Sequence, residues 1–243
     1  MPLRPVTRRS VSDEVFDQLL DGVVDGDLVA GEPLPSERRL AEVLGISRPA
    51  VREALQRIAQ TGLVEVRHGG ATTVRDFRRA AGLDLLPRLL VRGGRLDAAI
   101  GRSVIEARAE VGPGIAALAA TRGGPGLAAG LDEVIARMTA TTDAIAWQEL
   151  ALDYWDLLVD GADSLVFRLM YNSLRTAYEP ALPALAAILA DEVGQVEPYR
   201  LLAGAVRAGD APTARAAASR VLTPTAEALL TAFAALEASE AEQ

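Results

Sequence analysis

The chain has 243 residues, half of them hydrophobic, with one histidine and no cysteine. Without cysteine it can form no disulfide, no thiolate metal site and no cysteine nucleophile. Its net charge of −8, taken as a whole, argues against a nucleic-acid binder.

That charge is distributed unevenly along the chain. The first 79 residues carry 12 arginines and 12 acidic residues, so the entire net negative charge lies after Arg79. Residues 28–79 alone hold 9 arginines against 6 acidic residues, which makes this segment locally basic. The N-terminus is polar, and no segment offers about 18 uninterrupted apolar residues. We therefore expect a cytoplasmic protein that does not insert into a membrane.

The first predicted element is an amphipathic helix over residues 11–24, in which apolar residues recur at helical spacing. After a turn, Ser36 is a suitable N-cap for a short helix that Gly45 ends. We expect Leu40, Val43 and Leu44 to form the inward face of this second helix.

A third helix is predicted from Ser47, its N-cap, to about Thr61. Pro49 lies in the first turn, where its missing N–H costs nothing. After Gly62 the hydrophobic period changes from 3.6 to 2, through LVEVR, HGG and ATTVRDF, which predicts a hairpin of two short strands. Three helices, a tight turn between the second and third, and a hairpin predict a winged helix-turn-helix domain over residues 1–78.

The remaining chain, residues 79–243, has a helical hydrophobic pattern with no strand-like alternation. The protein is therefore expected to be mainly α, with an all-α bundle of six or seven helices as its second domain. We expect this domain to bind an effector and to mediate dimerisation. A short linker around residues 75–82 should couple it to the first domain.

Arg48 and Arg52 lie four residues apart on the third predicted helix, so they share one face. The opposite, apolar stripe consists of Val51, Leu55 and Ile58. A guanidinium group can bind guanine O6 and N7, and the first residues of a recognition helix reach base edges. Any one arginine is more simply a solvated surface charge, but Arg48 and Arg52 together with Arg38 on a helix-turn-helix indicate DNA reading.

Other residues of this segment also suit DNA. Arg38, near the start of the second helix, can contact a base or a phosphate, and the N–H groups near Ser36 and Ser47 suit phosphates. His68 lies at the hairpin tip, before two glycines that let the backbone approach a surface closely. It is either a DNA contact of the wing or an idle exposed side chain.

The stretch from Leu34 to Val74 resembles the winged-helix signature of the GntR superfamily of bacterial repressors, LPSERxLAxxLGxSRxxVRxALxxLxxxGLVxxRxGxGxxV. The resemblance implies a homodimer that binds a short palindromic operator in double-stranded DNA. The DNA-contacting residues that it implies are Arg38, Ser47, Arg48, Pro49, Arg52, His68 and Gly69. His68 and Gly69 would enter the minor groove. Pro49 stands where the family often has threonine, so one hydrogen bond to DNA would be absent.

The HGGATTVRDF segment and the helical remainder resemble the FadR branch of that superfamily. Most sensor domains of this branch, the FCD class, bind a divalent metal through one acidic residue and three histidines. The positions of the histidines are taken here by Asp156, Tyr199 and Val221, so the resemblance implies a domain without a metal cofactor. Asp153, Asp156 and Asp160 fall at helical spacing, and they form either a hard-cation site or a solvated acidic face.

A metal-free bundle with an apolar tunnel is typical of the sub-branch that senses long-chain acyl-CoA, and residues 152–178 resemble it. The resemblance implies long-chain acyl-CoA as the effector and a role in fatty-acid metabolism. Arg108 matches an arginine that commonly lines the cavity, and Asp153 and Tyr178 match in placing. Asn172 is a further candidate, because it lies beside aromatic residues, although it could equally lie on the surface. The coenzyme-contacting segment is replaced by LTPTAEALL.

Two alternatives stay open. One is an effector of another class, such as a sugar acid or an amino acid, bound without metal through Arg108. The other is an enzyme that uses Asp153 and Asp156 as acid and base. With one histidine, no cysteine and no glycine-rich phosphate loop in the helical half, we expect no enzymatic activity.

Overall fold

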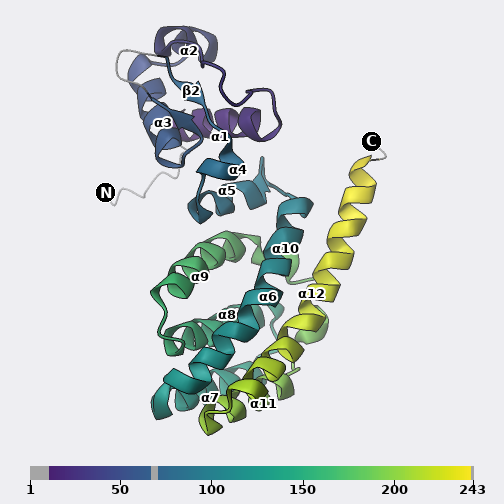
Figure 1. Ribbon diagram of the computed structural model, residues 1–243. Helices are drawn as coiled ribbons and strands as arrows, with labels where there is room; N and C mark the ends of the chain where they lie inside the picture. Colours follow the sequence, from purple (N-terminus) through teal and green to yellow (C-terminus); the bar gives the residue numbers. More distant parts are fainter. Residues whose placement is uncertain (1–10, 67–70, 242–243) are drawn as a thin grey trace, which may run out of the picture. The chain divides into compact units, whose positions relative to one another are not determined.

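The computed structural model describes residues 11–66 and 71–241 and divides the chain into two compact units, residues 1–88 and 89–243 (Figure 1). The expected division after residue 78 thus falls later, after Arg88. The reason is that Arg88 is bound to the first helix: its guanidinium donates to Asp17 at 2.5 Å and lies 4.3 Å from the centre of the Phe16 ring. Charge pairing and stacking on an aromatic ring both hold it there.

The first unit begins with three helices, α1 (Val11–Val24), α2 (Glu37–Leu44) and α3 (Arg48–Gln60). The expected caps are confirmed. The Ser36 hydroxyl accepts the N–H of Arg39 at 3.3 Å, and the Ser47 hydroxyl accepts that of Ala50 at 3.4 Å. Gly45 ends α2 with a φ of 67°, in the left-handed region that glycine adopts without strain.

The core of the first unit is built around α3, whose expected inner stripe is confirmed. Val51, Leu55 and Ile58 are all buried. The expected inner face of α2 is partly wrong, because Val43 is 64% exposed. Leu40 and Ala41 are buried instead, and at 100° per residue a stripe centred on them turns Val43 away from the core.

The expected hairpin is present as β1 (Val64–Glu65), which pairs antiparallel with β2 (Thr73–Val74). A bridge between Pro33 and Thr73, and a 2.7 Å hydrogen bond from the N–H of Leu34 to the carbonyl of Thr72, fix the other edge of β2. The described strands and the three helices therefore confirm the winged helix-turn-helix.

The second unit is a helical bundle, which confirms the expected class. From Ala98 onward, seven α-helices are present in the described residues: α6 (Ala98–Arg122), α7 (Gly124–Ala140), α8 (Ala144–Gly161), α9 (Leu165–Tyr178), α10 (Leu182–Leu185), α11 (Glu197–Ala208) and α12 (Ala211–Ala241). Single turns at Glu179–Ala181 (η2) and Ala190–Glu192 (η3) join some of them.

A short stretch between the wing and the bundle differs from the expected all-helical pattern. It contains α4 (Phe77–Ala80), η1 (Leu83–Leu85), α5 (Leu86–Leu90) and a hairpin of β3 (Val91–Arg92) and β4 (Arg95–Leu96). The hairpin turns at Gly93 and Gly94, both at positive φ, as a two-residue turn requires. Its strands are too short to show a hydrophobic alternation in the sequence.

Helices α6 and α12 run side by side and form the spine of the bundle (Figure 1). Glycines on α6 permit this close packing: a Cβ at Gly101 would lie 2.8 Å from the Phe233 ring, and one at Gly112 would lie 2.5 Å from Leu222. Both distances are shorter than real Cβ contacts, so the spacing of the two helices depends on these glycines.

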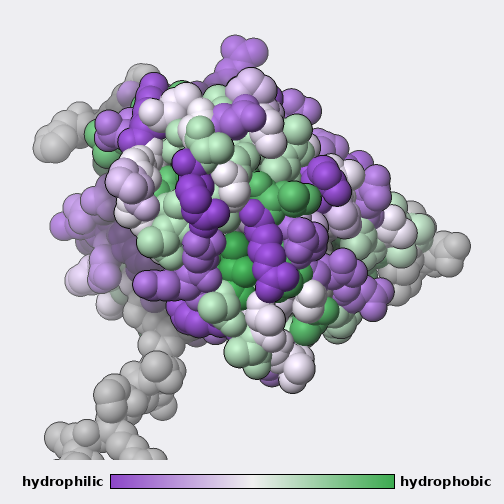
Figure 2. All heavy atoms as spheres, turned by 90° about the horizontal axis from the view of Figure 1, so that it is seen from below, coloured by the Kyte–Doolittle hydropathy of each residue, from purple (hydrophilic) through white to green (hydrophobic). Residues whose placement is uncertain are grey.

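Helix α12 is also long and apolar enough over Ala211–Ala238 to span a membrane, by length and composition alone. Its Leu222, Leu229 and Phe233 side chains are buried against the bundle, and 28% of the apolar segment is buried in all. On the face drawn in Figure 2, hydrophobic areas are interspersed with hydrophilic side chains and form no continuous apolar band.

Two glycines of α6, one closely packed and one with space around it, allow a matched test of this packing. We expect Gly112→Ala to lower the free energy of unfolding by about 1–3 kcal/mol, because the new methyl group overpacks against Leu222 and Trp155. The residue also precedes Pro113, which adds strain to a helical alanine. Gly114→Ala should instead stabilise by about 0.5–1 kcal/mol, since its nearest neighbouring atom, in Arg215, is 4.0 Å away. Urea unfolding measures both, and equal effects would contradict the packing described here.

Candidate nucleic-acid interface and ligand cavity

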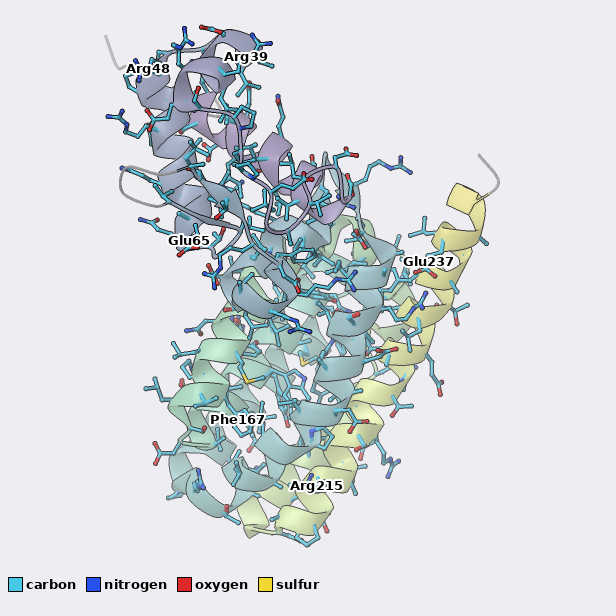
Figure 3. All side chains as sticks on the ribbon, turned by 45° about the horizontal axis from the view of Figure 1, so that its top comes forward. Arg39, Arg48, Glu65, Phe167, Arg215 and Glu237 are labelled. Atoms are coloured by element: carbon cyan, nitrogen blue, oxygen red, sulfur yellow. The ribbon has the colours of Figure 1, made fainter. Side chains whose placement is uncertain are left out.

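The exposed face of α3 carries the arginines expected to read DNA. Arg48 and Arg52 each have a side chain 60% exposed, on the side of the helix that adjoins the buried stripe. The Arg48 side chain projects outward from the first unit (Figure 3). Together with Pro49, Glu53 and Gln56 these arginines line a shallow hollow of the surface. The structure therefore brings Arg48, Pro49 and Arg52 together on one exposed face.

Glu37, on the first turn of α2, was missed by the sequence analysis. Its carboxylate accepts two hydrogen bonds from Arg52, Nε to Oε1 at 3.0 Å and Nη2 to Oε2 at 2.8 Å. Arg48 Nη2 lies 4.0 Å from the same carboxylate. The hydrogen bond from Arg52 lowers the pKa of Glu37 below its ordinary value, with a smaller contribution from the charge of Arg48. The carboxylate is thus held ionised between the two arginines.

The other predicted DNA contacts lie around this face. Arg38 is exposed on α2 and pairs loosely with Glu42 at 3.7 Å. The Ser47 hydroxyl caps α3 as an acceptor, which leaves its own O–H free to donate to a phosphate. His68 and Gly69 lie outside the described residues.

In the second unit, α6, α8 and α9 enclose a cavity of about 90 Å³. Most of its lining side chains are aliphatic or aromatic, and its charged lining residues are Arg108 and Arg175. Phe167 lines this cavity from α9 (Figure 3). A cavity of this kind suits a ligand with an apolar body and an anionic group.

The two arginines of the cavity differ in their pairing. Arg175 donates to Glu179 at 2.6 Å and to Asp153 at 3.1 Å, so its charge is already balanced. Arg108 is half-buried on α6, and among the described residues no hydrogen bond or ion pair engages it. Burying half of a guanidinium without a counter-charge costs desolvation free energy, and an anionic ligand that pairs with it would offset this cost.

The four predicted effector-binding residues separate into two groups. Arg108 and Tyr178 line the cavity, and the Tyr178 hydroxyl lies 3.5 Å from Gln148 Oε1. Asp153 does not line it and is held by Arg175. Asn172 is exposed, because it lies 100° around the helix from Tyr171, which faces the cavity. The structure therefore brings Arg108 and Tyr178 together, and not Asp153 or Asn172.

Three of the four acidic residues of α8, Asp153, Asp156 and Asp160, are paired with arginine. Arg168, from α9, binds Asp156 at 2.8 Å and also contacts Asp160. With Asp153 bound to Arg175, these carboxylates form neither a cation site nor a merely solvated face. Their negative charge instead attaches α9 to α8.

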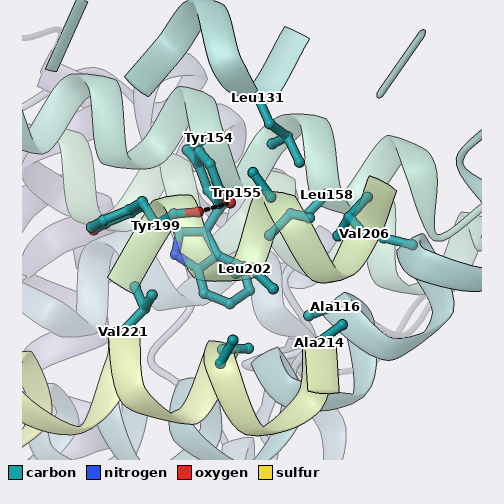
Figure 4. Packing of buried hydrophobic residues seen from close by; sticks show 14 of the residues in the cluster. Ala116, Leu131, Tyr154, Trp155, Leu158, Tyr199, Leu202, Val206, Ala214 and Val221 are labelled. Carbon is teal, nitrogen blue, oxygen red and sulfur yellow. Dashed lines mark hydrogen bonds between the residues drawn. The ribbon is translucent and has the colours of Figure 1, made fainter. Parts of the chain in front are cut away.

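Tyr199 and Val221 belong to a buried cluster with Tyr154, rather than with Asp156 (Figure 4). The Tyr154 hydroxyl donates to the carbonyl of Tyr199 at 2.9 Å, and the two rings are perpendicular with centres 5.0 Å apart. Burial raises the pKa of Tyr154 above its ordinary value, so it stays a neutral phenol. Phenol and aliphatic groups are not the imidazole ligands that zinc or nickel prefers, so these positions do not fit such an ion.

Comparison with known proteins identifies a family for each of the two units. Residues 11–74 match the gntR family of bacterial regulatory proteins, and residues 103–223 match the FCD domain. The chain is 54% identical to the HTH-type transcriptional regulator Mce2R of Mycobacterium tuberculosis over 91% of this chain and 92% of that protein.

More distant relatives extend the comparison. The fatty acid metabolism regulator protein of Serratia proteamaculans is 30% identical over 67% of this chain and 66% of its own length. A solved GntR family regulator from Pseudomonas syringae pv. tomato, 17% identical, shares the fold with a TM-score of 0.51 over 94% of this chain and 88% of that one. The chain therefore belongs to the gntR family of bacterial transcriptional regulators, with an FCD domain as its helical unit.

Proposed function

We propose that this regulator acts in the cytoplasm as a homodimer that binds a palindromic operator. Long-chain acyl-CoA, when it enters the helical unit, releases the protein from the DNA. A two-fold dimer presents two recognition helices to one face of DNA, which matches a palindrome. The observation that carries the DNA-binding part is the exposed pair Arg48 and Arg52 on one face of α3, outside its buried stripe.

The effector part rests on the cavity between α6, α8 and α9. An almost wholly apolar lining suits an acyl chain, and the unpaired Arg108 suits a carboxylate or phosphate. A polyhydroxylated sugar acid fits poorly, because each buried hydroxyl would need a hydrogen-bond partner. The name of the Serratia relative points to the same chemistry in that protein. We propose that binding needs no metal, since the donor set at Asp156, Tyr199 and Val221 does not fit one: Asp156 is bound by Arg168, and the other two residues offer no imidazole.

The size of the cavity implies how the ligand would act. Ligand pockets are typically about 300–1,000 Å³, so a cavity of about 90 Å³ is smaller than a long acyl chain requires. The chain can enter only if a wall moves. Helix α9 is the wall that can move most easily, because only Ala177 and Tyr178 of it are buried. A ligand that favours the opened bundle shifts the protein toward that state.

The same size favours a second candidate effector, a small carboxylic or amino acid with an apolar side chain. Such a molecule fits the cavity without displacing α9 and can still pair with Arg108. An enzymatic role is disfavoured, because Asp153 and Asp156 are bound by Arg175 and Arg168 and so are poorly placed as acid and base.

Loss of either recognition arginine should weaken specific binding. We expect Arg48→Ala or Arg52→Ala to cost about 1–3 kcal/mol of operator affinity, the usual value of a bidentate base contact. Arg200→Ala, which removes one exposed positive charge from the second unit, serves as the control and should leave affinity unchanged. Fluorescence anisotropy with a promoter fragment measures all three. Wild-type affinity in both arginine variants would show that α3 does not read the operator.

Ligand binding should appear as thermal stabilisation. With long-chain acyl-CoA at 100 times its Kd, we expect the unfolding free energy to rise by about 2.7 kcal/mol. Arg108→Gln should lose most of the shift, whereas Arg137→Gln, which does not line the cavity, should keep it. A shift produced only by a small apolar acid would support the second candidate. No Arg108-dependent shift with either ligand would contradict the proposed cavity.

A further inference from the structure

Arg52, one of the two exposed arginines of α3, is held in one orientation by a residue of the neighbouring helix. Both bonds to Glu37 leave from the same side of the guanidinium, one from Nε and one from Nη2. Glu37 is the first residue of α2, and the Ser36 cap fixes its backbone. The pair therefore joins the two helices of the helix-turn-helix through the side chain that faces DNA.

This arrangement leaves one defined edge of Arg52 available. A guanidinium group is planar and carries five N–H bonds in a fixed fork. Glu37 engages the Nε–H and one N–H of Nη2, so both N–H bonds of Nη1 and the second N–H of Nη2 remain. Two parallel N–H bonds on that edge match guanine O6 and N7.

We propose that Glu37 is a specificity-determining positioning residue of the operator interface, which holds Arg52 with its free edge toward a guanine. An unrestrained arginine can swing onto any nearby phosphate, which gives affinity without sequence information. The carboxylate opposes that motion in two ways: it anchors the guanidinium, and its negative charge repels the DNA backbone. Arg48 lies 4.0 Å from the same carboxylate and makes no hydrogen bond to it among the described residues, so the restraint acts on Arg52.

A stabilising role does not explain the pair. The Arg52 side chain is 60% exposed and that of Glu37 30%, and ion pairs in contact with solvent contribute little to folding. The geometry also differs from that of the other carboxylate on α2. Glu42 lies 3.7 Å from Arg38 and 3.5 Å from Arg39, within its own helix and through single contacts. Glu42 is therefore a matched control for loss of one negative charge from α2.

The inference rests on the proposed DNA binding, and the test uses the full-length protein. Glu37→Gln, Glu42→Gln, Arg52→Ala and the double variant Glu37→Gln with Arg52→Ala are compared with wild type. Affinity is measured for two DNA duplexes of equal length. One is a promoter fragment that the wild type protects from nuclease digestion, and the other is unrelated in sequence. The ratio of the two affinities measures specificity, and thermal melting confirms that each variant is folded.

We expect Glu37→Gln to lower the specificity ratio about tenfold while binding to the unrelated duplex stays equal or tightens. Glu42→Gln should leave the ratio unchanged. In the Arg52→Ala background, Glu37→Gln should cause no further loss, because the arginine that it positions is gone. A wild-type ratio in Glu37→Gln, or an equal loss with and without Arg52, would overturn the inference. If the wild type itself showed no preference for any promoter fragment, the proposed DNA binding would fail instead.

Discussion

The burial of one stripe of α3 determines how this protein can meet DNA. Val51, Leu55 and Ile58 are fixed in the core of the first unit, and a helix of 3.6 residues per turn then has only one face left for solvent. Arg48 and Arg52 occupy that face. The Ser47 cap sets where the helix begins, and so places Arg48 at its first turn, where recognition helices approach base edges. The burial of the apolar stripe thus fixes the direction in which Arg48 and Arg52 point, although neither side chain is part of the core.

In the helical unit, by contrast, an arginine is directed inward to a cavity. Arg108 is directed to an apolar cavity and left without a counter-charge among the described residues, whereas Arg168 and Arg175 are each paired with a carboxylate of α8. An unpaired, half-buried charge favours whatever state or ligand neutralises it. If a ligand binds an opened bundle more tightly than the closed one, the difference in affinity is the free energy available for a switch. Near-complete switching requires several kcal/mol.

The local features of the fold could be predicted from the sequence because short-range chemistry specifies them. Ser36, Ser47 and Gly45 mark helix ends through their own side chains or backbone freedom, and the inner stripe of α3 follows from its period. Val43 was misplaced because an alanine, Ala41, takes the inward position that a larger residue was expected to fill.

The tertiary features could not be predicted in this way. Glu37 and Arg52 are 15 residues apart on different helices, so no periodic pattern connects them. The pairing of Asp153 with Arg175 likewise depends on how α8 meets α9. By contrast, Arg108 and Tyr178 were recognised through resemblance, and the structure brings them to one cavity.

The central claim is that one chain binds an operator through α3 and releases it when the α6–α8–α9 cavity is occupied. The most direct measurement is titration of a preformed complex with a labelled promoter fragment by long-chain acyl-CoA, followed by fluorescence anisotropy, for wild type and Arg108→Gln in parallel. We expect the wild type to release the DNA and Arg108→Gln to retain it at the same ligand concentration. Equal release of both proteins, or a complex that no acyl ligand or small apolar acid disturbs, would contradict it.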